Sequence, residues 1–230
     1  MRALLLLPVL ALAACGGSDS DTVVVPDTGV VASDIDPCEA LTPADIASAL
    51  GVDVANVALD QEGTETGIEM GIIEPGTMCN YEISGDAPFD NASVTVSGYD
   101  SPDAAEAAFS SQYRARTAEE TAQIESAGDR AAEEMVADGR ADADAVEGMG
   151  GTLSRLANSS AYEPAPGIGD QAVVEINNIL DPPSVTSAFV RDGATVYALS
   201  VAPDYFFMQD AANADAIRDA HVALAREVVR

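Results

Sequence analysis

The dipeptide Asp192-Gly193 joins two stretches of alternating apolar side chains, at residues 185–191 and 194–202. An Asp-Gly pair between such stretches is one of the strongest local signals for a β-hairpin, because glycine adopts the positive φ of a tight turn without strain. We therefore expect these two stretches to pair as antiparallel strands. This hairpin favours a fold built on an antiparallel sheet.

Other stretches also have the pattern of strands. Residues 92–99 alternate small apolar positions with polar or larger ones, which is typical of a half-buried strand. Residues 78–83 and 172–177 are expected as strands, and 52–59 and 70–73 are weaker candidates. The stretch 70–73 is followed by a turn at 74–77, where proline and then glycine suit the central positions of a type II turn.

Three helices have clear sequence signals. Thr42 can cap a helix with Pro43 at its first position, and Ser101 with Pro102 opens a second one. A third is expected over 212–229, where apolar residues recur on one face. That stripe consists of Ile217, Ala220, Leu224 and Val228.

Residues 117–157 are rich in alanine and acidic side chains and poor in large apolar ones. Thr117 and Glu120 have the spacing of a capping box, so the segment is expected to be helical. We expect breaks at its glycines, which are Gly128, Gly139 and those within 148–151. The segment is interpreted as a peripheral helical insertion.

These elements together predict one α+β domain over residues 37–230. Strands that arrive as hairpins and helices that arrive in blocks favour an antiparallel sheet with helices packed on one side. A strand-strand-helix order occurs at 78–115 and again at 185–229, which suggests two similar halves.

The N-terminus carries a targeting signal. Residues 3–14 are a 12-residue apolar run after Arg2, whereas a bilayer-spanning helix needs about 20 residues. The run ends in Leu12-Ala13-Ala14-Cys15, which resembles a bacterial lipobox, in which the cysteine is acylated and becomes the new N-terminus. We expect a signal peptide over 1–14 and lipidation, including palmitate, at Cys15. Ordinary secretion with cleavage after Ala14 is the alternative.

Residues 15–36 are expected to form a flexible tether between the lipid and the domain, with an edge strand at 23–25 as the alternative. Two or more acyl chains give stable membrane attachment. By resemblance to the sorting rule of double-membrane bacteria, Gly16 after the cysteine directs the protein to the outer membrane. In a single-membrane bacterium the domain would lie on the outer face of the cytoplasmic membrane.

The chain is strongly acidic, with 39 acidic residues against ten basic ones and a formal net charge of −29. It contains no lysine. Nucleic-acid binding depends on neutralising phosphates with Lys and Arg, so nucleic acid is excluded as a partner. The scattered carboxylates favour a solvated surface over a divalent-cation site or a basic partner.

The chain has three cysteines, and if Cys15 carries lipid, two remain that can pair. Cys38 and Cys79 are therefore expected to form a disulfide, which an oxidising envelope permits. The alternative is metal binding by these two cysteines with His221. No CxxC or CxxH spacing supports that metal site.

No motif predicts catalysis or a cofactor. His221 is the only histidine, which excludes triads and multi-histidine metal sites, and there is no GxSxG sequence. Residues 167–172 (GIGDQA) fit a dinucleotide fingerprint by letter, but they follow a proline turn and enter a predicted strand. His221 is interpreted as a helix-flank residue with a satisfied hydrogen bond. The densest acidic cluster is Asp138, Asp142, Asp144 and Glu147, interpreted as solvated helix surface.

One aromatic run stands between the last strand and the last helix. It consists of Tyr205, Phe206, Phe207 and Met208. These side chains either pack the helix onto the sheet or form an apolar contact for a ligand or partner. They are the candidate contact residues from the sequence.

Three segments carry a family resemblance: residues 36–46 (DPCEALTPADI), 79–81 (CNY) and 167–172. They resemble motifs of small disulfide-containing bacterial lipoproteins of unknown function, best populated in actinobacteria. The layout is also similar to extracellular sensor domains of mycobacterial receptor kinases. The resemblance implies an α+β fold and a Cys38–Cys79 disulfide, and it brings no catalytic residue.

From these observations we expect a lipid-anchored, non-enzymatic envelope domain that binds an envelope protein or a small apolar ligand. The alternative is a structural or accessory envelope component without a ligand.

The lipid is directly testable. Mass spectrometry of the mature N-terminus should give Cys15 as the first residue, with the added mass of two or three acyl chains. An unmodified Gly16 or Cys15 at that end would contradict the lipobox interpretation.

Overall fold

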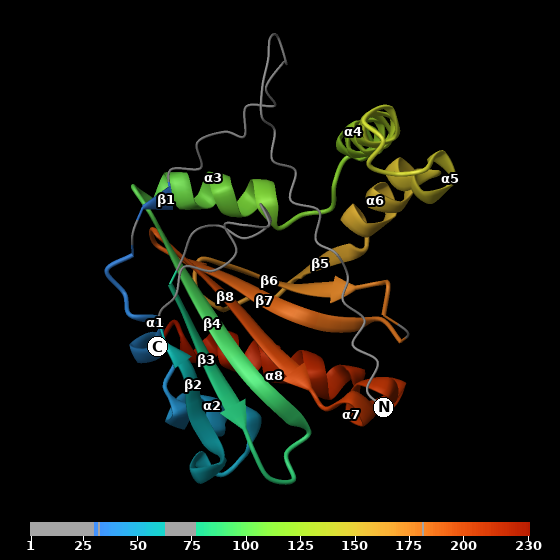
Figure 1. Cartoon of the computed structure of the whole chain (residues 1–230). Coiled ribbons are helices and arrows are strands. Elements are labelled where there is room, and N and C mark those ends of the chain that lie inside the picture. Colours follow the sequence, from blue (N-terminus) through green and yellow to red (C-terminus); the bar gives the residue numbers. More distant parts are fainter. Residues whose placement is uncertain (1–29, 32, 63–76, 181) are drawn as a thin grey trace.

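The computed structural model describes residues 30–31, 33–62, 77–180 and 182–230. They form one antiparallel sheet of eight strands with helices packed on it, so the predicted α+β fold is confirmed. The strand order is β2-β3-β4-β8-β7-β6-β5, with β1 on β4 beyond the end of β3 (Figure 1). The strands are β1 (Val30–Val31), β2 (Val57–Glu62), β3 (Thr77–Ile83), β4 (Phe89–Tyr99), β5 (Ser160–Pro164), β6 (Gln171–Asn177), β7 (Ser184–Asp192) and β8 (Thr195–Pro203).

The predicted hairpin is present as β7 and β8, with its turn one residue later than expected. Asp192 pairs with Thr195, so the loop is Gly193-Ala194, and Gly193 has φ +57°. Asp192 can stay in the ladder because another carboxylate serves the turn: Asp170 accepts the Gly193 N–H at 3.0 Å.

β4 is the longest strand and lies in the middle of the sheet. It pairs with β3 on one side and β8 on the other, and Val94 and Val96 are fully buried. Near its end, Val30 and Val31 add β1. A Cβ at Gly98 would lie 3.2 Å from the Val31 carbonyl oxygen, so glycine permits this close approach.

The N-terminal segment differs in part from the prediction. Residues 30–31, expected within the tether, are strand β1, because they pair with the free side of β4 where β3 has ended. The alternative edge strand at 23–25 and the segment 70–73 with most of its turn lie outside the described residues. Over 52–59, a 3₁₀ turn (Val54–Asn56) precedes β2 where a single strand was expected.

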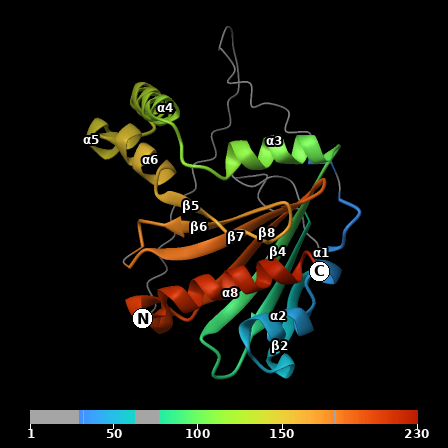
Figure 2. The same ribbon diagram turned by 180° about the vertical axis from the view of Figure 1, so that it is seen from behind.

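One face of the sheet holds the main core. The helices α1 (Pro37–Ala40), α2 (Pro43–Leu50) and α8 (Ala214–Glu227) lie on this face, as Figure 2 shows. The capping box predicted for α2 is present, since Thr42 accepts the Asp45 N–H and the Asp45 side chain accepts the Thr42 N–H. Fully buried core side chains here are Leu41, Ile46, Tyr81, Val94, Val174, Val190, Leu199, Val201, Ile217 and Leu224.

The other face carries α3 (Pro102–Gln112), so the helices are not confined to one side. Ala105, Ala108 and Phe109 pack there with Tyr99 and Val196 in a second core. The reason is that β4 and β8 present apolar side chains on both faces at this end. The strand-strand-helix order does occur twice, but α3 and α8 lie on opposite faces (Figure 1), so the halves are not copies.

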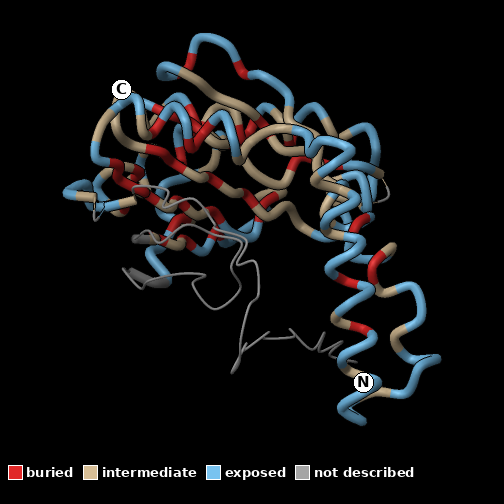
Figure 3. Tube along the Cα trace, turned by 90° about the horizontal axis from the view of Figure 1, so that it is seen from above, coloured by how far each residue is buried: buried red, intermediate tan, exposed pale blue. Residues whose placement is uncertain are grey.

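The insertion is a helical arm, residues 118–157, made of α4 (Ala118–Ala137), α5 (Ala143–Val146) and α6 (Met149–Ala157). The expected break at Gly128 is wrong, because this glycine lies inside α4 against α6. A Cβ at Gly128 would lie 2.6 Å from the Cα of Gly150, so the two backbones nearly touch. Figure 3 shows that the arm projects from the sheet and is mostly exposed.

Short elements complete the chain after β8. They are α7 (Tyr205–Gln209) and a 3₁₀ turn (Ala211–Asn213) that leads into α8. In the part of the chain that the structure describes, no helix has the length and apolar character needed to cross a membrane.

The predicted disulfide is present. The Cα atoms of Cys38 and Cys79 are 5.3 Å apart, and the bond ties α1 to β3. Beside it, the buried Tyr81 hydroxyl donates a hydrogen bond to the Leu41 carbonyl. Burial, with smaller contributions from Asp36 and Asp45, raises the pKa of Tyr81 to about 12, so this hydroxyl keeps its proton.

Removing the disulfide should lower the free energy of unfolding by about 4 kcal/mol, on the loop-entropy model for a bridge that spans 41 positions. Urea unfolding of a Cys38→Ala, Cys79→Ala variant would measure this, and reduction of the native protein should give the same loss. Reductant should leave the double variant unchanged. Equal stability of the native protein and the variant would contradict the expectation.

Candidate functional site

A cavity with a volume of about 600 Å³ lies between the helical arm and the sheet. We call it the arm cleft. Its walls come from the end of α3 and the link to α4, from α4 and α6, and from β5 and β6. Its lining is Ser111, Gln112, Arg114, Arg116, Glu120, Ile124, Ala127, Gly128, Ala131, Leu153, Leu156, Ala157, Ser160, Tyr162 and Glu175.

The arm side of the cleft is apolar. Ile124, Leu153 and Leu156 lie there with alanines of both helices. Leu153 and Leu156 are 40% and 51% exposed and lie side by side with Ile124 in this wall, and neighbouring exposed apolar side chains of this kind can form a contact for a ligand. The backbones of α4 and α6 pack closely at Gly128 and Gly150, and Gly128 and Leu153 line the cleft beside this contact.

The base of the arm is polar and tightly bonded. Arg114 donates to both carboxylate oxygens of Glu120, at 2.5 and 2.9 Å, and the Thr117 N–H donates to Glu120 at 2.7 Å. The Arg114 hydrogen bond and then the Thr117 N–H lower the pKa of Glu120 to about 2. This pair is therefore ionised and mutually neutralised at any physiological pH.

A second group of polar side chains lies on the strand side. Glu175 of β6 accepts hydrogen bonds from the hydroxyls of Ser160 and Tyr162, the latter at 3.5 Å. Arg116 donates from Nε to the Ala157 carbonyl at 3.0 Å, which fixes it at the end of α6 just before β5. The burial of Tyr162 raises the pKa of its hydroxyl, Glu175 raises it further and Arg116 opposes the shift.

An aromatic cluster stands beside this polar group. Tyr113 stacks on Phe189 with ring centres 4.0 Å apart, and Phe109 meets Tyr113 edge-on at 4.9 Å. Tyr162 lies 6.3 Å from Tyr113 and 6.4 Å from Phe189. The cluster joins α3, β5 and β7, so no local sequence pattern could have revealed it.

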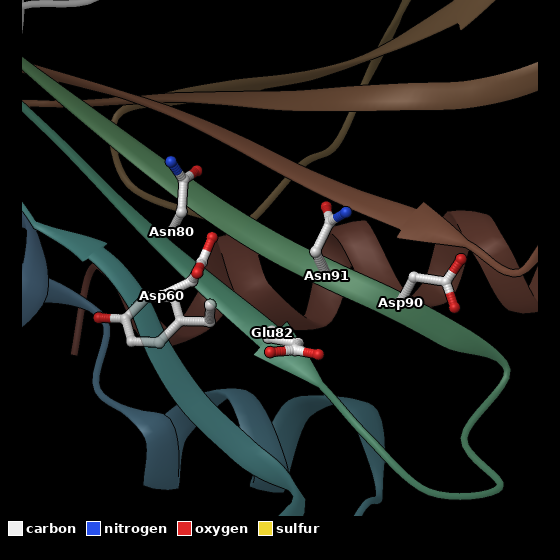
Figure 4. A pocket seen from close by; sticks show the side chains of 6 residues that line it. Asp60, Asn80, Glu82, Asp90 and Asn91 are labelled. Carbon is white, nitrogen blue, oxygen red and sulfur yellow. The ribbon is translucent and has the colours of Figure 1, made fainter. Parts of the chain in front are cut away.

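The second cavity is a shallow polar hollow on the open face of β2, β3 and β4, with a volume of about 330 Å³ (Figure 4). It is lined by Asp60, Asn80, Tyr81, Glu82, Asp90 and Asn91. Its carboxylates are exposed, and the described residues contain no group of three His, Cys, Asp or Glu side chains placed to hold a metal ion. We therefore regard the arm cleft as the stronger site.

The structure divides the aromatic run predicted as a contact. Phe207 packs edge-on against Phe89 at 5.9 Å, and Met208 is half-buried. Tyr205 and Phe206 are 63% and 80% exposed and contact each other at 5.6 Å. None of the four lines the arm cleft.

The GIGDQA segment and the acidic cluster at 138–147 both lie outside the arm cleft lining. Asp170 of the GIGDQA segment binds the buried Arg191 at 3.0 Å, and a Cβ at Gly169 would lie 2.6 Å from the Arg191 carbonyl oxygen, so this segment clamps the β7–β8 turn. Asp138 and its neighbours are exposed on the arm, where Asp138 pairs with Arg140. Cys15 lies outside the described residues.

Comparisons of this chain with protein-family models, with curated proteins and with solved structures found no match. The family resemblance of residues 36–46, 79–81 and 167–172 stays a prediction.

His221 is a fully buried residue of α8 that faces β8 instead of lying at the helix flank, and the hydrogen bonding predicted for it is present. Its Nε2 accepts the Val201 N–H at 3.2 Å, and its Nδ1 lies 2.8 Å from the Ile217 carbonyl oxygen. A neutral imidazole with its proton on Nδ1 satisfies both groups. The pairing of β7 with β8 ends at Leu199, so the Val201 N–H lies beyond it, and His221 accepts the hydrogen bond from this N–H. The β6–β7 pairing is also irregular nearby, where Thr186 is bulged out of the ladder.

Burial lowers the pKa of His221 below its ordinary value of 6.5. The contribution of His221 to the free energy of unfolding is therefore fully present above pH 6.5. It decreases as the pH falls toward the lowered pKa, because the unfolded chain takes up a proton that the folded chain resists. His221→Gln should be about 1–3 kcal/mol less stable at pH 8, owing to a misplaced buried hydrogen-bonding group.

Chemical denaturation from pH 8 to 5 would measure this. The difference between the native protein and His221→Gln should narrow below pH 6.5, since only the native chain has an imidazole to titrate. A difference that stays constant across this range would contradict a neutral buried His221.

Proposed function

We propose that this protein is a bacterial envelope lipoprotein, anchored through lipid on Cys15, whose domain binds an amphipathic molecule in the arm cleft without catalysing a reaction. The observation that carries the proposal is the apolar wall of that cleft. Leu153 and Leu156 are half-exposed toward a cavity of about 600 Å³, in a chain with a formal charge of −29.

Two properties of the cleft support ligand binding. Its volume lies within the ordinary range of small-molecule sites, and it combines an apolar wall with a few polar groups that can fix an orientation. Covering the two leucines with a ligand would remove apolar surface from water, which contributes about 25 cal/mol per Å².

The attachment of the arm also suits binding. The arm joins the sheet through the links 113–117 and 158–159, and Arg116 and Thr121 hold its base by hydrogen bonds to Ala157 and Asn158. Most of its internal contact is between α4 and α6. The cleft therefore has one wall on the sheet and one wall on a unit that packs mainly on itself.

A neutral fluorescent probe tests this proposal. Every described element lies after Gly29, so the chain from Gly16 onward keeps the whole fold without acyl chains of its own. This chain should bind N-phenyl-1-naphthylamine with a rise in fluorescence. Leu156→Glu should weaken binding about tenfold or more, because it replaces an apolar contact with a charge.

The matched control is Ile179→Glu. Ile179 is 55% exposed, close to the 51% of Leu156, but it lies outside the cleft. This variant should bind the probe as the native chain does. Absence of probe binding, or an equal loss in both variants, would contradict the proposal and favour an accessory component without a ligand.

A further inference from the structure

The arm cleft contains two charged side chains of opposite sign that have no ionic partner. Among the described residues, neither Arg116 nor Glu175 has an opposite charge within salt-bridge distance, whereas Arg114 and Glu120 neutralise each other. Both unpaired side chains line the cleft. The cleft therefore offers one positive and one negative contact in addition to its apolar wall.

Both charges lie near one hydroxyl, that of Tyr162. Glu175 accepts a hydrogen bond from Tyr162 at 3.5 Å, and Arg116 is fixed at Ala157, three positions before Ser160, which also donates to Glu175. Both charges influence the pKa of Tyr162, in opposite directions. They are thus close to the same point of the cleft without contacting each other.

The aromatic ring of Tyr162, which lines the cleft, stands next to the negative contact, and two further rings outside the lining pack around it. Tyr162 bonds to Glu175, and Tyr113 and Phe189 lie 6.3 and 6.4 Å from the Tyr162 ring. Aromatic faces beside a carboxylate favour an ammonium group, above all a quaternary one. The guanidinium of Arg116 favours a phosphate or carboxylate, to which it can donate from its terminal nitrogens.

The net charge of the whole chain favours some ligand charges over others. A formal charge of −29 repels a purely anionic molecule before it reaches Arg116. A purely cationic molecule would meet Glu175 but would leave Arg116 facing a like charge. A molecule that carries both charges avoids both costs.

We infer that the arm cleft takes an amphiphile with a zwitterionic head group, such as a phosphocholine or phosphoethanolamine lipid. Its anionic group meets Arg116, its ammonium group meets Glu175 and the Tyr162 ring, and its acyl chain covers Leu153 and Leu156. This inference rests on the proposed function, since it names the class of molecule that occupies the same cleft.

Three dodecyl amphiphiles test it, each used below its micelle concentration with the chain from Gly16 onward. They are dodecylphosphocholine, dodecyl phosphate and dodecyltrimethylammonium, which share one chain and differ in head-group charge. Displacement of N-phenyl-1-naphthylamine gives the three affinities. We expect the zwitterionic compound to bind at least tenfold more tightly than either of the others.

Charge variants then assign each contact. Arg116→Gln should abolish the preference for dodecylphosphocholine over dodecyltrimethylammonium, and Glu175→Gln should abolish its preference over dodecyl phosphate. Glu175→Gln keeps an oxygen for Ser160 and Tyr162, and Arg116→Lys should retain the native preference. Arg130→Gln and Glu119→Gln remove charges of the same sign on α4, outside the cleft lining, and should have no effect.

The outcomes separate this inference from the proposed function. Equal affinities for the three amphiphiles, or preferences that the cleft variants do not alter, would overturn the zwitterion assignment while probe binding upholds the apolar cleft. Absence of binding of the probe and of all three amphiphiles would overturn both.

Discussion

The antiparallel pairing of β4 with β8 is the interaction on which the rest of the molecule depends. It joins an N-terminal β2-β3-β4 unit to a C-terminal β5-β6-β7-β8 unit, and the ladder runs from Phe89 opposite Pro203 to Gly98 opposite Thr195. Because these two strands present apolar side chains on both faces, they anchor the main core beneath α8 and the smaller core beneath α3. In the sequence the arm lies between α3 and β5. The pairing of β4 with β8 places these two elements relative to each other, and the cleft forms between the arm, β5 and β6.

Local signals predicted the elements of this fold well. The caps at Thr42 and Ser101, the strand at 92–99 and the Asp192-Gly193 hairpin each depend on a few neighbouring residues, and each is present in the structure. The disulfide followed from cysteine parity and is also present. Features set by packing between distant segments were not predictable in this way. Gly128 has the local signature of a helix break, but the contact with Gly150 decides its role, and only the assembled sheet shows that α3 and α8 lie on opposite faces.

The same distinction applies to the candidate site. An aromatic run such as 205–208 is visible in the sequence, whereas the cleft combines Arg116, Leu156, Tyr162 and Glu175 from four separate segments. No pattern of spacing connects these residues. The sequence did provide the electrostatic background of the cleft, which is a chain without lysine and with a large excess of carboxylates. Burial of His221 likewise could not be deduced, because it depends on the packing of α8 against β7 and β8, which lie earlier in the chain.

The position of β1 has a consequence for how neighbours can approach the molecule. Val30 pairs with Tyr99, so the chain enters the domain at one end of β4, while α7 follows Pro203 at the other end. An 11-residue strand separates these two ends by roughly 35 Å. The exposed rings of Tyr205 and Phe206 therefore lie at the end of β4 remote from β1, and a companion molecule docked on them would leave the β1 end of the sheet uncovered.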